Sequence, residues 1–192
     1  MKKERSGLRL WFWWLVFIAL IALLTLLALK LTRHEKLIES NQPGLYSINH
    51  FIDGDTVAVN MNGSVETVRM IGVDTPETHK PNTPVQCYGE TAASYTKNLI
   101  GKNKVRLQAD SLDTNRDRYG RLLRYVYLPD STLVEERLIQ NGYGFAYTQF
   151  PFEKSEQFKA DEQEAKTNNL GLWSACMVTV ESNGREQTNS AQ

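Results

Sequence analysis

Three short segments of the chain combine carboxylates with arginines. They are residues 52–56 (IDGDT), 68–78 (VRMIGVDTPET) and 116–121 (RDRYGR). Taken singly, each has an ordinary structural explanation, such as an Asp-Gly turn or a solvated run of charge. Together they contain what hydrolysis of a phosphodiester needs. Carboxylates suit a hard cation such as calcium, arginine forks donate paired hydrogen bonds to a phosphoryl group, and a further carboxylate can orient or deprotonate water.

Arg69 is the most informative of these residues, because it lies in the middle of an otherwise apolar predicted strand. A buried guanidinium is costly unless it has a charged or hydrogen-bonding partner. A buried Arg69 would therefore need a partner in the fold.

The order and spacing of the three segments resemble the staphylococcal (micrococcal) nuclease family, also called thermonucleases, over about residues 45–174. The resemblance implies an α+β fold: an OB-fold-like, five-stranded Greek-key β-barrel with three helices. It also implies bound Ca²⁺ and hydrolysis of DNA and/or RNA to 3′-phosphate products.

Site residues follow from the resemblance by position. Asp55, Asp74 and the carbonyl of Thr75 correspond to calcium ligands. Glu77 matches the proposed general base, which either removes a proton from water or only orients it. Arg69 and Arg121 match the two arginines that grip the scissile phosphate, and Arg121 is also the candidate for stabilising the leaving oxygen.

Three further positions correspond to substrate contacts. Tyr119 matches a tyrosine beside the phosphate, Arg118 stands where the family often has lysine, and Tyr147 matches the first residue of a Tyr-x-Tyr pair near the base. Gln149 replaces the second tyrosine, so we expect base preference and affinity to differ from the family type more than catalysis does.

Arg69 and Asp74 are five residues apart, so a regular strand would point them to opposite faces. If they share a site, as the resemblance implies, a bulge or strand end must separate them, and Gly72 is the expected place. A catalytically inactive nucleic-acid- or protein-binding barrel is the alternative function. The enzyme is favoured because all five charged positions of the expected site are present.

The pattern of apolar residues predicts the elements that must position these groups. Strands are expected at 45–49, 56–60, 65–73, 104–109 and 122–128. A helix should bury a face from Ala92 to Leu99, and a third helix should cover about 153–168. Between them, Thr132 and Glu135 predict a capping box for a second helix that ends at Gly142.

The N-terminal fifth differs from the rest of the chain. Residues 1–9 are basic, and residues 10–29 carry no charge, which is long enough to span about 30 Å of hydrocarbon. We expect a transmembrane signal anchor at 10–32, a polar linker at 33–44, the nuclease-like domain at 45–176 and a disordered tail at 177–192. Membrane contact is thus expected through residues 10–32, and no protein partner can be inferred from the sequence.

Charge around the apolar run favours a cytoplasmic N-terminus, with four basic residues before it and three after it. The expected location is the cell membrane, with a single pass and an extracytoplasmic nuclease domain. Secretion after signal cleavage is the alternative.

Net charge and cysteines add two constraints. Six of the 22 basic and one of the 22 acidic residues lie up to Arg33, which leaves 16 basic and 21 acidic residues beyond it. Because nucleic-acid binders that rely on counterion release are usually basic, we expect weaker and more calcium-dependent substrate binding here. Cys87 and Cys176 are either two separate thiols or, in a domain outside the cytoplasm, a disulfide.

Overall fold

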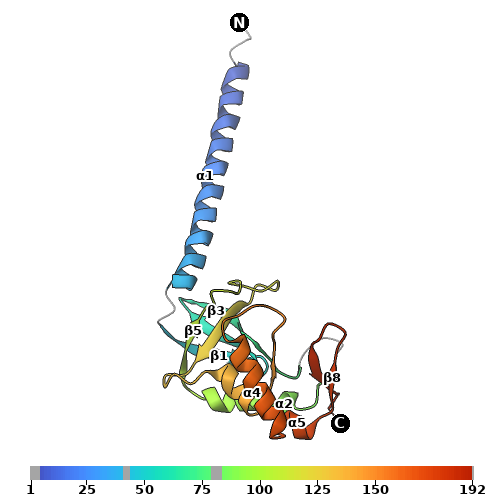
Figure 1. The fold of residues 1–192 in the computed structure, drawn as a ribbon. Helices are drawn as coiled ribbons and strands as arrows, with labels where there is room; N and C mark the ends of the chain where they lie inside the picture. The colour runs from blue at the N-terminus through green and yellow to red at the C-terminus, as the bar shows by residue number, and fades with distance from the viewer. Residues whose placement is uncertain (1–4, 41–43, 79–83, 192) are drawn as a thin grey trace. The chain divides into compact units, whose positions relative to one another are not determined.

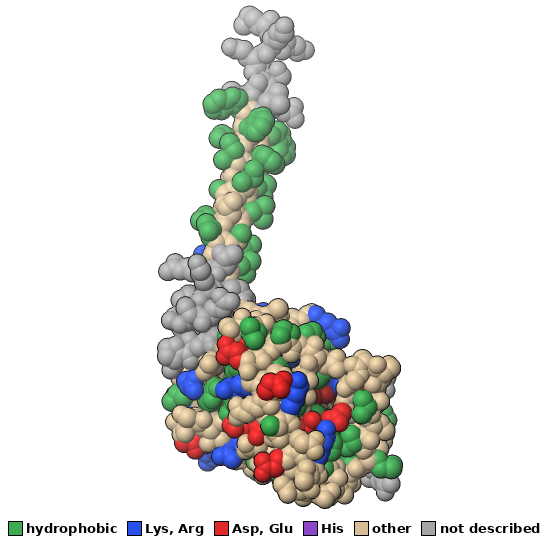
Figure 2. All heavy atoms as spheres, viewed as in Figure 1, with side chains coloured by type: hydrophobic (Ala, Val, Ile, Leu, Met, Phe, Trp, Pro, Cys, Tyr) green, Lys and Arg blue, Asp and Glu red, His purple; other side chains and the backbone are tan. Residues whose placement is uncertain are grey.

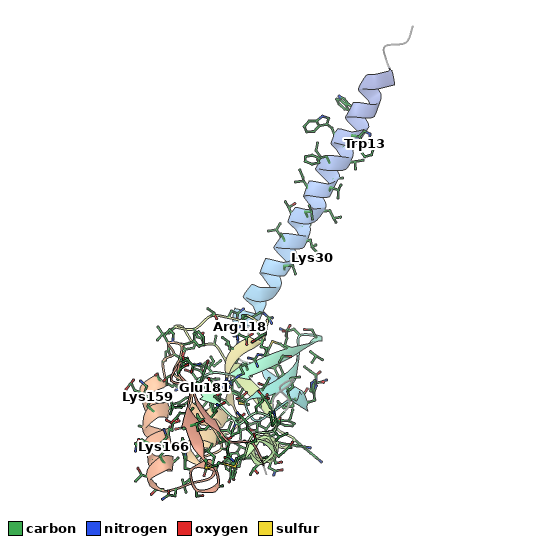
Figure 3. All side chains as sticks on the ribbon, turned by 90° about the vertical axis from the view of Figure 1, so that its right-hand side faces the viewer. Trp13, Lys30, Arg118, Lys159, Lys166 and Glu181 are labelled. Carbon is green, nitrogen blue, oxygen red and sulfur yellow. A yellow bond between two sulfur atoms is a disulfide. The ribbon has the colours of Figure 1, made fainter. Side chains whose placement is uncertain are left out.

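The computed structural model describes residues 5–40, 44–78 and 84–191 and divides the chain into two units, Met1–Asn41 and Gln42–Gln192. The first unit contains a single helix, α1 (Arg5–Ser40). Its stretch Trp13–Leu31 has a mean hydropathy of 2.6, and none of it is buried. Figure 2 shows apolar side chains along this helix, and Figure 3 shows them between Trp13 and Lys30. By length and composition the stretch is able to cross a membrane, a property that signal sequences share.

Helix α1 is longer than the predicted span. It continues through residues 33–40, which the sequence analysis assigned to a polar linker. The remaining linker residues 41–43 lie outside the described part of the chain, as does His79 near the candidate site.

The second unit is built on a closed barrel of five strands in the order β1-β2-β3-β6-β5 (Figure 1). The strands are β1 (Leu45–Phe51), β2 (Thr56–Met61), β3 (Ser64–Met70), β5 (Lys104–Gln108) and β6 (Leu122–Tyr127). All neighbours pair antiparallel except β3 and β6, which are parallel, and β1–β5 pairing closes the barrel. Val, Leu and Met side chains at alternate strand positions are buried in its interior, and the closed barrel confirms the predicted fold class.

Three helices cover the barrel: α2 (Gly89–Ile100), α3 (Val134–Gln140) and α4 (Ser155–Thr167), and a short α5 (Leu172–Ala175) follows them. Each of the three buries an apolar face, through residues such as Ala92, Leu138 and Phe158. The predicted capping box at α3 is absent. Leu133 is the N-cap and no side chain caps the helix. The Glu135 side chain is fully buried and accepts the Val126 N–H at 2.9 Å, because the barrel offers a donor that water cannot reach.

Gly72 breaks the strand that the sequence predicted to run to Val73. Strand β3 ends at Met70, Gly72 adopts φ 74°, and the two-residue strand β4 (Val73–Asp74) then pairs with β7 (Phe145–Ala146). A Cβ at Gly72 would come within 2.6 Å of the Phe152 ring, so both space and backbone conformation favour glycine. This break lets Asp74 turn toward the same side as Arg69.

The C-terminal segment differs from the predicted disordered tail. Strands β8 (Val178–Val180) and β9 (Glu186–Thr188) pair as an antiparallel hairpin, hereafter the C-terminal hairpin (Figure 1). The segment lacks apolar periodicity, and tertiary contacts hold it instead. Cys87 and Cys176 form a disulfide with Cα atoms 5.9 Å apart, and the Cys87 N–H donates to the Asn189 carbonyl at 2.7 Å.

Candidate active site

The turn between β1 and β2 holds Asp55 below the surface. The N–H groups of Ile52 and Asp53 donate to the Thr56 carbonyl at 3.1 and 3.3 Å, and the Thr96 hydroxyl on α2 donates to the Gly54 carbonyl at 2.6 Å. A Cβ at Gly54 would lie 2.8 Å from the Thr75 side chain, so glycine allows the Asp53–Asp55 turn to pack against the segment after β4.

Asp55 and Thr75 are joined directly, although 20 residues separate them. The Thr75 N–H donates to Asp55 Oδ2 at 2.7 Å and its hydroxyl donates to the same oxygen at 3.1 Å. The Thr56 hydroxyl donates to Asp55 Oδ1 at 2.9 Å. These bonds orient a carboxylate whose side chain is only 6% exposed.

Arg69 bridges the two predicted calcium-ligand carboxylates. Its NH1 atom lies 3.2 Å from Asp55 Oδ1, and its NH2 atom lies 3.1 Å from Asp74 Oδ1. NH1 also donates to the Met70 and Val73 carbonyls at 3.0 and 2.7 Å. Burial opposes the charge of Arg69, but Asp55 and Asp74 outweigh it and raise the pKa of the guanidinium. The partners that a buried Arg69 needs are therefore these two carboxylates.

The positive charge of the neighbouring arginines does not fully balance the carboxylates of this cluster. Burial, followed by the neighbouring Asp55, raises the pKa of Asp53 to about 8. Burial also raises the pKa of Asp74, even though two arginines contact it. Asp53 therefore belongs to the charge cluster, whereas the sequence analysis treated it only as part of a turn.

The donor chemistry of this cluster fits a hard cation, because carboxylate and carbonyl oxygens are the ligands that calcium prefers. Within the described ranges, no three His, Cys, Asp or Glu side chains are grouped as a metal site. The expected ligand set does not need three such side chains, since it consists of Asp55, Asp74 and a backbone carbonyl. In other calcium sites, water or phosphate oxygens complete the coordination.

Glu77 lies three residues after Asp74 in a loop that Gln86 secures. The Glu77 N–H donates to Gln86 Oε1 at 2.7 Å, and the Gln86 N–H donates to the Glu77 carbonyl at 2.9 Å. The Thr78 N–H donates to the Glu77 carboxylate at 3.1 Å. The backbone around this half-buried carboxylate is thus held from both directions.

Arg121 is positioned by the loop that precedes β6. Its Nε donates to Asp117 Oδ2 at 2.7 Å, and its N–H donates to Asp117 Oδ1 at 3.0 Å. Leu123 is the register partner of Arg69 in the parallel β3–β6 pair, and Arg121 lies two residues before Leu123. Because alternate strand residues share a face, the register directs Arg121 and Arg69 to the same side of the sheet.

Tyr119 and Arg118 belong to the same loop. Tyr119 is 69% exposed, with the Arg118 Cζ 4.8 Å and the Arg121 Cζ 5.5 Å from its ring centroid. Arg118 NH2 also donates to the Tyr119 hydroxyl at 2.8 Å. The three predicted residues therefore form one exposed aromatic and cationic group.

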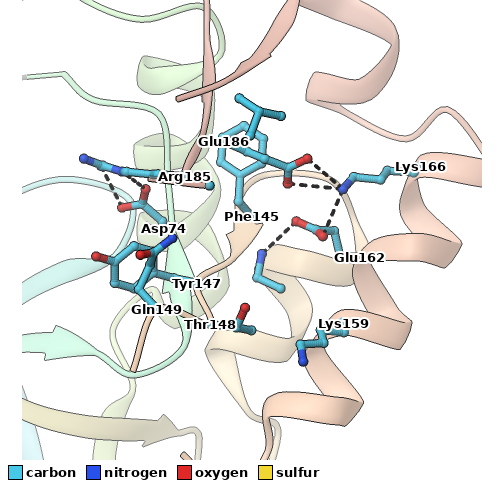
Figure 4. Close-up of a pocket in the computed structure, with 13 residues that line it drawn as sticks. Asp74, Phe145, Tyr147, Thr148, Gln149, Lys159, Glu162, Lys166, Arg185 and Glu186 are labelled. Carbon is cyan, nitrogen blue, oxygen red and sulfur yellow. Dashed lines mark hydrogen bonds and ion pairs between the residues drawn. The ribbon is translucent and has the colours of Figure 1, made fainter. Parts of the chain in front are cut away.

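Tyr147 reaches the other end of the site. Its N–H donates to the Gly72 carbonyl at 2.8 Å, and its ring lies 6.1 Å from that of Phe150. Tyr147, Gln149 and Asp74 help to line a cavity of about 250 Å³ between β7, α4 and the C-terminal hairpin (Figure 4). Gln149, which replaces the family's second tyrosine, donates to the Asn183 carbonyl in the hairpin turn at 3.0 Å.

Arg185 is a second residue of the site, after Asp53, that the sequence pattern did not reveal. From the hairpin, its Nε lies 2.8 Å from Asp74 Oδ2 and its NH2 lies 3.1 Å from Asp74 Oδ1 (Figure 4). Asp74 is thereby shared by two arginines. No local pattern in the polar tail indicates this contact, because the two residues are 111 positions apart.

Comparison with known proteins identifies the family of this chain. A family model described as "Staphylococcal nuclease homologue" matches residues 67–175. The chain is 48% identical over 130 residues to the SPbeta prophage-derived endonuclease YokF of Bacillus subtilis (strain 168). The aligned region covers 67% of this chain and 43% of that protein. It is 46% identical over 147 residues to the endonuclease YncB of the same organism, which covers 74% of this chain and 67% of that protein.

The chain is also 41% identical to the thermonuclease of Staphylococcus hyicus over 130 residues, which covers 67% of this chain and 75% of that enzyme. The matched region includes the end of β3 with Arg69, Asp74, Glu77 and the loop before β6, where most of the site residues lie. The chain therefore belongs to the staphylococcal nuclease homologue family.

Proposed function

We propose that this chain is a calcium-dependent nuclease that hydrolyses DNA and/or RNA to 3′-phosphate products. The observation that carries the proposal is the Arg69 guanidinium, which bridges the Asp55 and Asp74 carboxylates at 3.2 and 3.1 Å. Relatives named as endonucleases and a thermonuclease support the same reaction class.

Asp55, Asp74 and the Thr75 carbonyl would hold the cation. When bound, calcium would supply positive charge beside the scissile phosphate and a coordination point for phosphate and water oxygens. The protein would hold these ligands ready, because the Thr75 N–H and hydroxyl already orient Asp55.

The remaining residues would act on the phosphate and the water. Glu77 would orient or deprotonate a water whose oxygen attacks phosphorus, while the bond from phosphorus to the 5′ oxygen breaks. Arg69 and Arg121 would donate hydrogen bonds to the charge that develops on the phosphoryl oxygens, and Arg121 would also stabilise the departing oxygen. Tyr119, Arg118 and Tyr147 would contact the rest of the nucleic acid.

The experiment is cleavage of plasmid DNA and of RNA by the full chain in detergent, in calcium and in a calcium chelator. We expect cleavage only in calcium, and 3′ ends that a polymerase extends only after phosphatase treatment. Glu77→Gln and Arg121→Ala should each lower turnover by about 10²- to 10⁴-fold. Arg106→Gln is the matched control, because Arg106, on β5, lies over the ring of Tyr127 on β6.

The outcomes separate the alternatives. Near-normal turnover in either site variant, with an unchanged melting temperature, would refute the residue assignments. Calcium-independent binding of nucleic acid without cleavage would instead support a catalytically inactive binding barrel.

We also propose that α1 anchors the chain in the cell membrane, with the barrel outside the cytoplasm. The apolar stretch Trp13–Leu31 and the Cys87–Cys176 disulfide support this location. Fractionation of expressing cells, followed by protease treatment of intact cells, tests it. A chain released by alkaline carbonate, or found free in the medium, would contradict the anchor and support secretion after cleavage.

A further inference from the structure

The C-terminal hairpin is fastened over one end of the candidate site by contacts at its base and its tip. At the base, Cys176 is bonded to Cys87 and the Thr188 hydroxyl donates to the Cys87 carbonyl at 2.8 Å. Near the tip, Glu186 accepts from Lys166 Nζ on α4 at 2.9 Å (Figure 4). The hairpin is thus a built part of the cavity wall.

Arg185 uses both oxygens of Asp74. Its Nε bonds Oδ2 at 2.8 Å, and its NH2 bonds Oδ1 at 3.1 Å, the oxygen that Arg69 also contacts. The Asp74 side chain is 10% exposed and that of Arg185 is 34% exposed. Because this ion pair is largely shielded from water, it is screened less than a surface pair.

A cation bound to Asp74 would lie close to the Arg185 guanidinium, which already bonds both carboxylate oxygens. A calcium ion needs at least one Asp74 oxygen as a ligand, and its two positive charges would repel Arg185 at close range. Arg69 is held independently by the Met70 and Val73 carbonyls, whereas Asp74 is the one hydrogen-bond acceptor of the Arg185 side chain among the described residues. Arg185 is therefore the group that must shift.

We propose that Arg185 is a further residue of the site, which occupies Asp74 in the cation-free protein and thereby sets the affinity for calcium. Cation binding then loosens the tip of the C-terminal hairpin, residues 181–185, while the Glu186–Lys166 ion pair and the disulfide keep the rest of the hairpin in place. By linkage, whatever holds the tip down weakens cation binding to the same extent. The inference rests on the proposed calcium dependence of the site.

The test is calorimetric titration of calcium into the chelator-treated full chain in detergent. We expect Arg185→Gln to lower the dissociation constant about tenfold, within the 5- to 150-fold range of typical coupling between sites. Lys159→Gln is the matched control. Lys159 lines the same cavity (Figure 4), and its substitution removes the same charge. Lys159 pairs with Glu156 instead of Asp74, so the calcium affinity of this variant should stay within about twofold of the wild type.

A second measurement needs no substitution. Amide hydrogen exchange in the wild-type chain should become faster across residues 181–185 when calcium is saturating, while exchange in β2 and β3 should not. Unchanged or weaker calcium affinity in Arg185→Gln, or a hairpin tip that calcium does not loosen, would overturn the inference.

The two proposals fail differently. If the wild type binds calcium, and Asp74→Asn abolishes that binding, but Arg185→Gln leaves it unchanged, only the role of Arg185 is overturned. If the wild type binds no calcium and needs none for cleavage, the calcium dependence fails and the role of Arg185 fails with it.

Discussion

Removal of the Cys87–Cys176 disulfide should cost the second unit much of its stability. The bond joins residues 89 positions apart, so it closes a loop of about 90 residues. In the chain-entropy model the lost loop-closure entropy is about 15 cal/mol/K, which corresponds to about 4.6 kcal/mol at 25 °C. A net stability of about 5–15 kcal/mol is typical for a domain, so this is a large share.

The structure also indicates where the loss should begin. Two hydrogen bonds beside the disulfide would remain, from the Cys87 N–H to the Asn189 carbonyl and from the Thr188 hydroxyl to the Cys87 carbonyl. They are not covalent, so they would no longer limit how far the hairpin can move from α2. Without the covalent link, the C-terminal hairpin should open before the barrel unfolds.

Thermal unfolding followed by circular dichroism measures the effect in Cys87→Ser/Cys176→Ser. For a unit of about 150 residues we expect the melting temperature to fall by about 10–18 °C. Reductant should produce a similar fall in the wild type and none in the double variant, which serves as the control. A fall of less than about 3 °C in both would refute the reasoning, because it would mean that the loop constraint contributes little.

Two further predictions concern the elements that position the site. Gly72→Ala should destabilise the protein by about 1–3 kcal/mol more than Gly63→Ala, as measured by urea unfolding. Both glycines have a positive φ, but only Gly72 faces packed aromatic rings. Equal losses of stability in the two variants would contradict the packing argument. Burial raises the pKa of Glu135 well above its usual value, so the folded state retains a proton that the unfolded state has released. The contribution of Glu135 to stability is therefore most favourable below about pH 4.5 and declines as pH rises toward the folded pKa. In Glu135→Gln, the urea concentration at the unfolding midpoint should decrease less with rising pH above about pH 5 than in the wild type. The same decrease in both proteins would show that other groups cause this pH dependence.

The short-range features of this protein were readable from the sequence. Alternating apolar residues indicated the barrel strands, because strand periodicity depends only on neighbouring positions. The three charged segments identified the family, and Gly72 was the expected break between Arg69 and Asp74. These inferences needed no knowledge of which distant segments meet.

Tertiary structure alone decided the rest. Glu135 fits a capping box by its spacing from Thr132, yet it turns inward because the buried Val126 N–H needs an acceptor. Arg185 lies in a polar segment with no periodic signal, yet it contacts Asp74 from 111 residues away. Local sequence carries no record of such pairings, since their energy arises only when the disulfide and the barrel bring the two segments together.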